Sequence, residues 1–193
     1  MHEISSAAVF CGSRLGVDPA FAAAAGDLGV GMANAGIRLV YGGGGTGIMG
    51  VLADAVLGAG GTVLGVIPDF LRKWEVAHPG VTKMVITDNM HDRKRIMAEE
   101  SDAFVVMPGG IGTMEEAVEV ISWRALRLHD KPIYICDVAG SAAPLVAAVE
   151  GMIAHGFAEP GARGLFTLVN GVPALLEHLA KKARDTKVSG PRL

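Results

Sequence analysis

The amino-acid sequence predicts an α/β protein with one doubly wound, Rossmann-like sheet that is mostly parallel and carries helices on both faces. Two observations lead to this fold class. Short apolar runs rich in β-branched residues alternate with alanine-rich stretches of helical length. Glycine supplies 27 of the 193 residues, about twice its usual share, and clusters where predicted strands meet predicted helices. One domain is expected over residues 1–184, with a polar tail at 185–193.

The predicted elements follow from local pattern. The short apolar runs predict strands at 7–11, 38–42, 62–68, 83–87, 103–108, 132–137 and 165–169. The run at 103–108 is apolar throughout, as in a strand buried on both faces. Helices are expected at 18–36, 47–60, 88–100, 113–128, 142–155 and 171–183. Asp18 is placed to cap the first helix, with Pro19 in its first turn, and Asp88 can cap the third.

The charge balance and the cysteine usage argue against several classes of function. Seventeen Lys and Arg against 20 Asp and Glu give a formal charge of −3, which removes the electrostatic attraction expected of a nucleic-acid or anionic-membrane binder. Cys11 and Cys136 stand in apolar runs outside any CxxC or Cys/His cluster, as reduced packing residues do. His78, His91 and His129 lack the paired spacing of metal ligands, so neither a metal nor another cofactor is expected.

No segment has the pattern of a membrane anchor or a secretion signal. The N-terminus lacks a basic region followed by an apolar stretch, and no run reaches the 18 or so apolar residues of a membrane span. We therefore expect a cytoplasmic protein without membrane partners.

The first glycine cluster, YGGGGTGIMG at 41–50, matches the dinucleotide pattern GxGxxG twice, and Asp69 lies about 20 residues further on. The usual fingerprint opens the first strand–helix unit, whereas this cluster follows the second predicted strand. The hypothesis of a nicotinamide-dependent dehydrogenase rests on this match alone. Two interpretations remain open, a tight strand-to-helix turn or a backbone cradle beside a ligand.

The second cluster, MPGGIGTMEE at 107–116, is more informative. Pro108 ends the strand, the glycines allow a close approach of the backbone to a ligand, and Thr113 can cap the following helix. Free N–H groups and the positive end of the helix dipole suit a phosphate there. Neither cluster is a Walker P-loop, because no GK[ST] follows. A nucleoside monophosphate is therefore easier to justify than a triphosphate.

Charged residues near these turns are the candidates for chemistry. Glu116 lies one helical turn from Thr113 and projects toward the ligand-facing end, whereas Glu115 points about 100° away and is expected at the surface. Arg93 and Lys94 lie near the start of a helix, where cations oppose the dipole and so do not serve helix stability. They also follow the carboxyl end of a predicted strand, which favours an anionic or electron-rich ligand there. The competing interpretations are a dipole-stabilising acid at Glu116 and a solvated basic face.

Together these residues resemble the Lonely Guy (LOG) family of cytokinin-activating phosphoribohydrolases. The family pattern PGGxGTxxE is present without departure at 108–116, and the family's RK pair appears as Arg93–Lys94 at the right spacing. The likeness runs from about residue 7 to residue 180. It includes the first glycine cluster and the stretches VFCGS at 9–13, WEVAH at 74–78 and HDKPIY at 129–134.

The resemblance implies hydrolysis of the N-glycosidic bond of a nucleoside 5′-monophosphate, which releases the base and ribose 5-phosphate. The base would be an N6-prenylated adenine, a cytokinin, with AMP as a lesser substrate. By resemblance Arg93 and Glu116 are the catalytic pair. The residues expected to contact the ligand are Glu75, Lys94, Gly109, Gly110, Ile111, Gly112, Thr113, Met114 and Glu115. Family members form dimers or larger assemblies, so a homo-oligomer is expected, with a dimer favoured.

The chemistry fits Glu116 independently of the resemblance. Cleavage of a ribosyl–base bond builds positive charge on the sugar, which a carboxylate stabilises. A non-catalytic nucleotide-binding or molybdenum-cofactor carrier protein is the alternative, since such a protein needs the glycine cradle but not the Arg93 and Glu116 pair. Related sequences are also described as lysine decarboxylases. This chain is short for a pyridoxal-phosphate enzyme and has no identifiable Schiff-base lysine.

Overall fold

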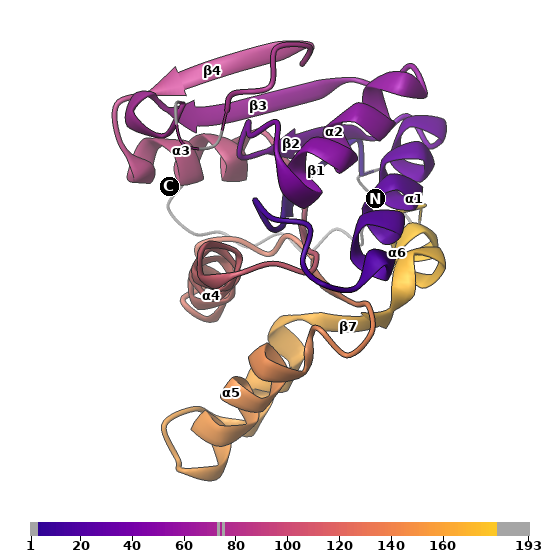
Figure 1. Ribbon diagram of the computed structural model, residues 1–193. Helices are drawn as coiled ribbons and strands as arrows, with labels where there is room; N and C mark the ends of the chain where they lie inside the picture. Colours follow the sequence, from indigo (N-terminus) through magenta and orange to yellow (C-terminus); the bar gives the residue numbers. More distant parts are fainter. Residues whose placement is uncertain (1–3, 73, 75, 181–193) are drawn as a thin grey trace.

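The sheet is the organising element of the protein. A computed structural model describes residues 4–72, 74 and 76–180, and the predicted tail at 185–193 lies outside them. The described residues build a seven-stranded sheet in the order β4-β3-β2-β1-β5-β6-β7 (Figure 1). All six neighbouring strand pairs are parallel. The predicted fold class, a doubly wound parallel α/β sheet, is confirmed.

Strands and helices alternate along the chain as the sequence predicts. The strands are β1 (Ser6–Phe10), β2 (Arg38–Tyr41), β3 (Val63–Pro68), β4 (Lys83–Thr87), β5 (Ala103–Val106), β6 (Ile133–Asp137) and β7 (Thr167–Asn170). The helices are α1 (Pro19–Asn34), α2 (Gly47–Gly58), α3 (Met90–Glu99), α4 (Ile111–Ala125), α5 (Ala143–Ala154) and α6 (Gly171–Ala180). Two 3₁₀ segments, η1 (Asp69–Leu71) and η2 (Pro160–Leu165), stand between them.

Two predicted helix starts are wrong. Asn89, not Asp88, caps α3, because its side-chain oxygen accepts the N–H of Asp92 at 2.9 Å. Helix α4 begins at Ile111 with Gly110 as its N-cap, so Thr113 lies inside the first turn instead of capping it. Glycine is one of the residue types found at helix N-caps, and the chain turns into α4 at Gly110, earlier than the threonine predicts.

The helices cover both faces of the sheet. On one face, side chains of α1, α2 and α6 pack with the sheet in one core cluster. On the other face, side chains of α3, α4 and α5 pack in a second cluster. Every residue of β1, β3 and β5 is buried, as expected for strands covered on both faces. The chain runs outward from β1 to β4 and then returns to β5 on the other side of β1. The carboxyl ends of β1 and β5 therefore form the switch point, where open α/β sheets bind ligands.

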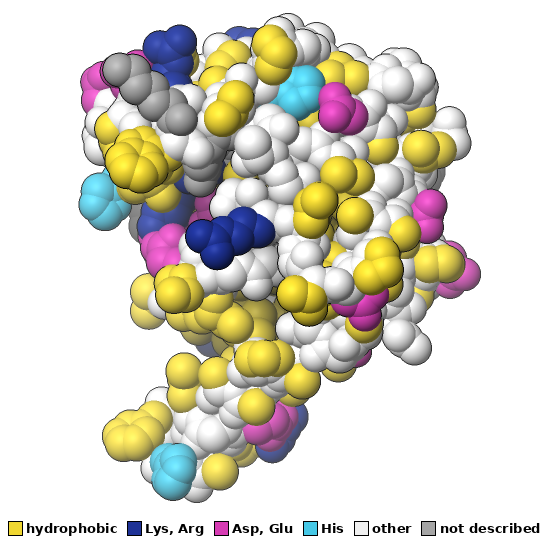
Figure 2. Space-filling model, viewed as in Figure 1, with side chains coloured by type: hydrophobic (Ala, Val, Ile, Leu, Met, Phe, Trp, Pro, Cys, Tyr) yellow, Lys and Arg dark blue, Asp and Glu magenta, His cyan; other side chains and the backbone are white. Residues whose placement is uncertain are grey.

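Helix α5 and segment η2 extend away from the body of the molecule (Figure 1). Figure 2 shows hydrophobic side chains gathered on this arm and where it leaves the body. Met152 and Phe157 are large exposed apolar residues of this arm, and Val118 and Leu126 are exposed apolar residues in and directly after α4. Among the described residues, no helix combines the length and hydrophobicity needed to cross a bilayer.

Candidate active site

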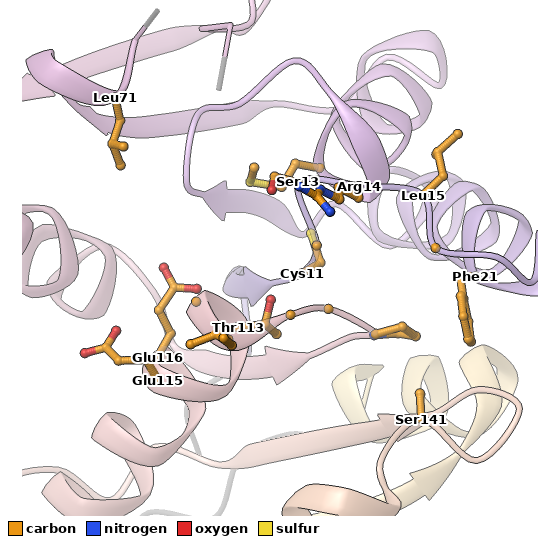
Figure 3. A pocket seen from close by; sticks show the side chains of 18 of the residues that line it. Cys11, Ser13, Arg14, Leu15, Phe21, Leu71, Thr113, Glu115, Glu116 and Ser141 are labelled. Carbon is orange, nitrogen blue, oxygen red and sulfur yellow. The ribbon is translucent and has the colours of Figure 1, made fainter. Parts of the chain in front are cut away.

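A cleft of about 810 Å³ opens at the switch point of the sheet (Figure 3). Its walls come from the loop after β1, the loop after β5 and the first turns of α4, with Met90 and Arg93 of α3 and Ser141 of the loop after β6 at its sides. Six of the nine residues expected to contact the ligand line it, in addition to the catalytic candidate Arg93. They are Gly109, Gly110, Ile111, Gly112, Thr113 and Glu115. Glu116 lines it as well.

The loops after β1 and β5 are in direct contact, and glycines make this possible. The N–H of Gly12 donates to the carbonyl of Pro108 at 3.0 Å. A Cβ on Gly109 would overlap the Thr113 side chain and would lie 2.9 Å from the Gly12 nitrogen. Any side chain at Gly109 therefore pushes the two loops apart or displaces α4.

The amino end of α4 offers unsatisfied N–H groups to the cleft. No side chain caps this helix, whose N-cap is Gly110. Gly110 and Gly112 are exposed, Ile111 is 91% exposed, and the Thr113 side chain is buried beneath them. Uncapped N–H groups at the positive end of a helix dipole bind phosphate readily. This end of the cleft has the chemistry of an anion site.

Arg93 is a buried cation that is fixed by backbone carbonyls. Its side chain is 5% exposed, its Nε donates to the carbonyl of Val66 at 3.2 Å, and its Nη2 donates to the carbonyl of Gly42 at 3.0 Å. A Cβ on Gly42 would overlap the guanidinium. The first glycine cluster thus has a specific purpose at Gly42, where the backbone must come close to Arg93. Charge-assisted bonds of this kind hold the arginine in one orientation at the cleft.

Glu115 and Glu116 differ in environment, as the sequence predicts. Both acids line the cleft, but Glu116 is half-buried whereas Glu115 is exposed. The ammonium of Lys94 lies 2.6 Å from Glu115 and 2.9 Å from Glu119, one turn further along α4. Burial works against the charge of Lys94, but hydrogen bonds to both carboxylates outweigh it and raise the lysine's pKa.

Several predicted site residues lie elsewhere than in the cleft lining. Lys94 binds the two carboxylates of α4 and does not line the cleft. Met114 is half-buried and packs against the core beneath α4, next to a cavity of about 30 Å³ behind the glycine turn. Glu75 lies outside the described residues. Near it in sequence, His78 is anchored, because its Nε2 lies 3.0 Å from Asp54 and its Nδ1 accepts the N–H of Gly80 at 3.1 Å.

The loop after β1 contributes residues to the cleft that the sequence did not predict. Gly12, Ser13, Arg14 and Leu15 line the cleft, and so does Phe21 of α1. Figure 3 shows Ser13 and Arg14 across the cleft from Thr113 and Glu116. The signal was available, since the rule that ligands bind at the carboxyl ends of strands beside a switch point applies to β1 as much as to β5.

These features define a class of protein, a doubly wound α/β protein with a glycine-lined cleft at the switch point of its sheet. A family model described as a possible lysine decarboxylase matches residues 49–179. A probable cytokinin riboside 5′-monophosphate phosphoribohydrolase of Oryza sativa subsp. japonica is 41% identical over 184 residues, which are 95% of this chain and 82% of that protein. A cytokinin riboside 5′-monophosphate phosphoribohydrolase of Rhodococcoides fascians is 43% identical over 82% of this chain and 80% of its own. The chain belongs to this family, the Lonely Guy (LOG) family, as the motifs predict.

Solved structures share the fold. The molybdenum cofactor carrier protein of Chlamydomonas reinhardtii matches with a TM-score of 0.69 over 93% of this chain and 96% of that chain, at 20% identity. A molybdenum cofactor binding protein of Rippkaea orientalis matches with a TM-score of 0.67 at 18% identity. At these identities the likeness shows the fold alone.

Proposed function

We propose that this protein hydrolyses the N-glycosidic bond of nucleoside 5′-monophosphates, with N6-prenylated AMP or AMP as substrate, to the free base and ribose 5-phosphate. One observation carries the proposal. The cleft brings Arg93 and Glu116 together with an uncapped helix end that suits a phosphate. The names of the family members in Oryza sativa and Rhodococcoides fascians support the same reaction.

In the proposed reaction, one group of cleft residues binds the phosphate and another stabilises the transition state. The Gly109–Thr113 turn would hold the 5′-phosphate and so present the ribose to Glu116. The bond between C1′ and the base nitrogen breaks, its electron pair goes to the base, and positive charge develops on the sugar. The Glu116 carboxylate stabilises this charge and orients the attacking water, whose oxygen forms the new bond to C1′. A proton from the water ends on the base.

Arg93 has two possible tasks in this scheme, which are to bind an oxygen of the ligand or to assist departure of the base. Its buried, carbonyl-bound guanidinium suits either, because its orientation is fixed before the ligand arrives. Glu115, Ile111, Gly112 and Met114 belong to the proposed ligand-binding segment. Lys94 would contact a ligand only if its ion pair with Glu115 or Glu119 were broken. Glu75, between β3 and β4 in the sequence, is proposed to contact the ribose.

The proposal includes a homodimer in the cytoplasm. The exposed apolar side chains of Val118, Leu126, Met152 and Phe157, on α4 and the arm that carries α5, support self-association. The buried Cys136 is a free thiol, which suits a reducing compartment. Size-exclusion chromatography with light scattering tests the dimer directly.

A panel of substrates tests the function. AMP, prenyl-AMP, other purine and pyrimidine monophosphates and adenosine are incubated with the protein, and release of ribose 5-phosphate or ribose is measured. We expect turnover of purine monophosphates and much slower cleavage of adenosine. Tight nucleotide binding without any release of ribose 5-phosphate would instead identify a non-catalytic carrier. Equal rates for adenosine and AMP would remove the phosphate site from the proposal.

A further inference from the structure

Two arginines of the described residues line the cleft, and their surroundings differ. Arg93 is buried and directs two of its N–H groups to backbone carbonyls. Arg14 is exposed on the loop after β1. Among the residues that the structure describes, no carboxylate forms an ion pair with Arg14. The acid Glu115, which shares the cleft, is already neutralised by Lys94 at 2.6 Å. Arg14 is therefore a cation in the cleft lining that has no carboxylate counter-ion among the described residues.

The backbone that carries Arg14 is held firmly between the two glycine clusters. From one side, the N–H of Met49 donates to the carbonyl of Gly12 at 3.1 Å, and the hydroxyl of Thr46 donates to the carbonyl of Ser13 at 3.3 Å. A Cβ on Gly47 would overlap the peptide that joins Ser13 to Arg14, and Gly47 has a positive φ of 63°. The first cluster thus clamps the loop after β1 as well as making room for Arg93.

From the other side, the loop after β5 touches the same segment. The Gly12 N–H bonds to the carbonyl of Pro108 at 3.0 Å, and a Cβ on Gly12 would lie 3.2 Å from the Cα of Gly109. Gly12 therefore contacts the turn that precedes α4, and Arg14 follows Gly12 by two residues in the chain. Figure 3 shows Arg14 and Thr113 on opposite sides of the cleft.

We propose that Arg14 is a second anchor for the substrate's 5′-phosphate and sets the preference of the enzyme for a monophosphate over the nucleoside. The inference rests on the proposed function. The phosphate would lie between the uncapped N–H groups of α4 and the Arg14 guanidinium. A guanidinium binds a phosphate through two parallel charge-assisted hydrogen bonds, which are stronger than hydrogen bonds between neutral groups. Because the loop is clamped, only the side chain has to be ordered on binding.

The test compares Arg14→Met with Arg14→Lys and with Arg95→Met. Arg95 lies on the exposed side of α3, where it pairs with Glu99 at 2.9 Å, so its loss changes the net charge equally but does not alter the cleft. For Arg14→Met we expect the KM for AMP to rise about 10- to 100-fold, with kcat changed less than threefold and adenosine cleavage unchanged. Arg14→Lys should restore part of the affinity, and Arg95→Met should match the wild type.

Calorimetric binding of ribose 5-phosphate separates this inference from the proposed reaction. A tenfold or greater loss of ribose 5-phosphate affinity in Arg14→Met supports the anchor even if no nucleotide is hydrolysed, in which case the proposed reaction fails alone. Unchanged affinity for ribose 5-phosphate together with an unchanged KM for AMP overturns the anchor while the reaction stands. An equal loss of adenosine and AMP cleavage in Arg14→Met also overturns it, because a phosphate contact cannot affect the nucleoside.

Discussion

The two ends of the parallel sheet are built for different purposes. At the carboxyl ends of β1 and β5, glycine loops leave helix N–H groups uncapped beside an open cleft. At the amino ends of the same two strands, polar groups bind one another. One oxygen of Asp102 accepts the N–H and the hydroxyl of both Ser5 and Ser6 at 2.9–3.0 Å. Polar groups therefore bind one another at one end of the sheet and remain uncapped beside the cleft at the other.

The same contrast holds for the cations at the two ends. At the amino end, Arg38 donates to the carbonyl and the carboxylate of Glu100 at 2.7 and 2.8 Å, and Lys131 donates to the carbonyl of Ala98 at 2.5 Å. At the carboxyl end, Arg14 has no such partner among the described residues. Substitutions at the carboxyl end should reduce activity more than stability, whereas substitutions at the amino end should do the reverse.

The largest effect is expected for Glu116→Gln. Removal of the carboxylate charge takes away the group that would stabilise the developing cation, so kcat should fall at least ~100-fold. Glu115→Gln is the matched control, because it makes the same chemical change on a neighbouring, exposed residue. It should lower kcat by less than about tenfold. Steady-state hydrolysis of AMP or prenyl-AMP measures both. Near wild-type turnover of the Glu116 variant would remove this residue from the mechanism.

Gly109→Ala should damage both activity and packing. The added methyl overlaps Thr113 and crowds the Gly12 nitrogen, so the turn and α4 must shift relative to each other. A displacement of about 1 Å at a reacting centre can cost on the order of 100-fold, and we expect kcat/KM to fall by about 10- to 100-fold. Gly110→Ala is the control for packing, because a Cβ there meets nothing within 4 Å. Thermal denaturation should show a lower melting temperature for Gly109→Ala than for Gly110→Ala.

At the opposite end of the sheet, Asp102→Asn should lower stability and leave kcat unchanged. Burial alone would raise the pKa of Asp102, but the four hydrogen bonds from Ser5 and Ser6 outweigh it and hold the pKa below its ordinary value of 3.8. The charged form of Asp102 is favoured in the folded state. The carboxylate therefore stabilises the fold fully above pH 3.8, and this stabilisation is lost as the pH falls through the lower pKa of the folded state. Loss of the charged acceptor should cost about 1–3 kcal/mol in urea unfolding at pH 7. A loss of AMP hydrolysis in the folded variant would contradict this division between the two ends.

The smallest expected effect concerns His129. Burial lowers the pKa of its imidazole from the ordinary 6.5, despite the bond of Nε2 to the carbonyl of Val120 at 2.9 Å, and its Nδ1 is buried without a partner among the described residues. The unfolded chain binds the proton more readily, so stability should decrease by less than about 1 kcal/mol as the pH falls below 6.5. His129→Phe should remove this dependence and retain the packing on Phe104, whose ring centroid lies 5.1 Å from that of His129. Unfolding curves between pH 5 and 7.5 would measure the difference, and equal slopes for the two proteins would contradict it.

Much of the candidate site could be predicted from the sequence because its signals are local. The PGGIGT turn, the spacing of Glu116 from it and the Arg93–Lys94 pair all lie within short segments whose elements are clear from pattern. The partners of Lys94 could not be predicted, because whether its ammonium meets a ligand or two carboxylates depends on the distance between α3 and α4. The start of α4 was misplaced for a related reason, since a glycine can precede a helix without a side-chain cap.

The class of fold, the order of the elements, the family and the two segments that carry Glu116 and Arg93 could all be inferred from the amino-acid sequence. These inferences follow from periodicity and from residues close together in the chain. Which glycines are required, and which residues meet, depends instead on the tertiary structure. Gly42 makes room for Arg93, which lies 51 positions further along the chain, and the segment from Gly12 to Arg14 is clamped between two glycine turns. Such contacts depend on the packing of parallel strands side by side, which no local pattern encodes.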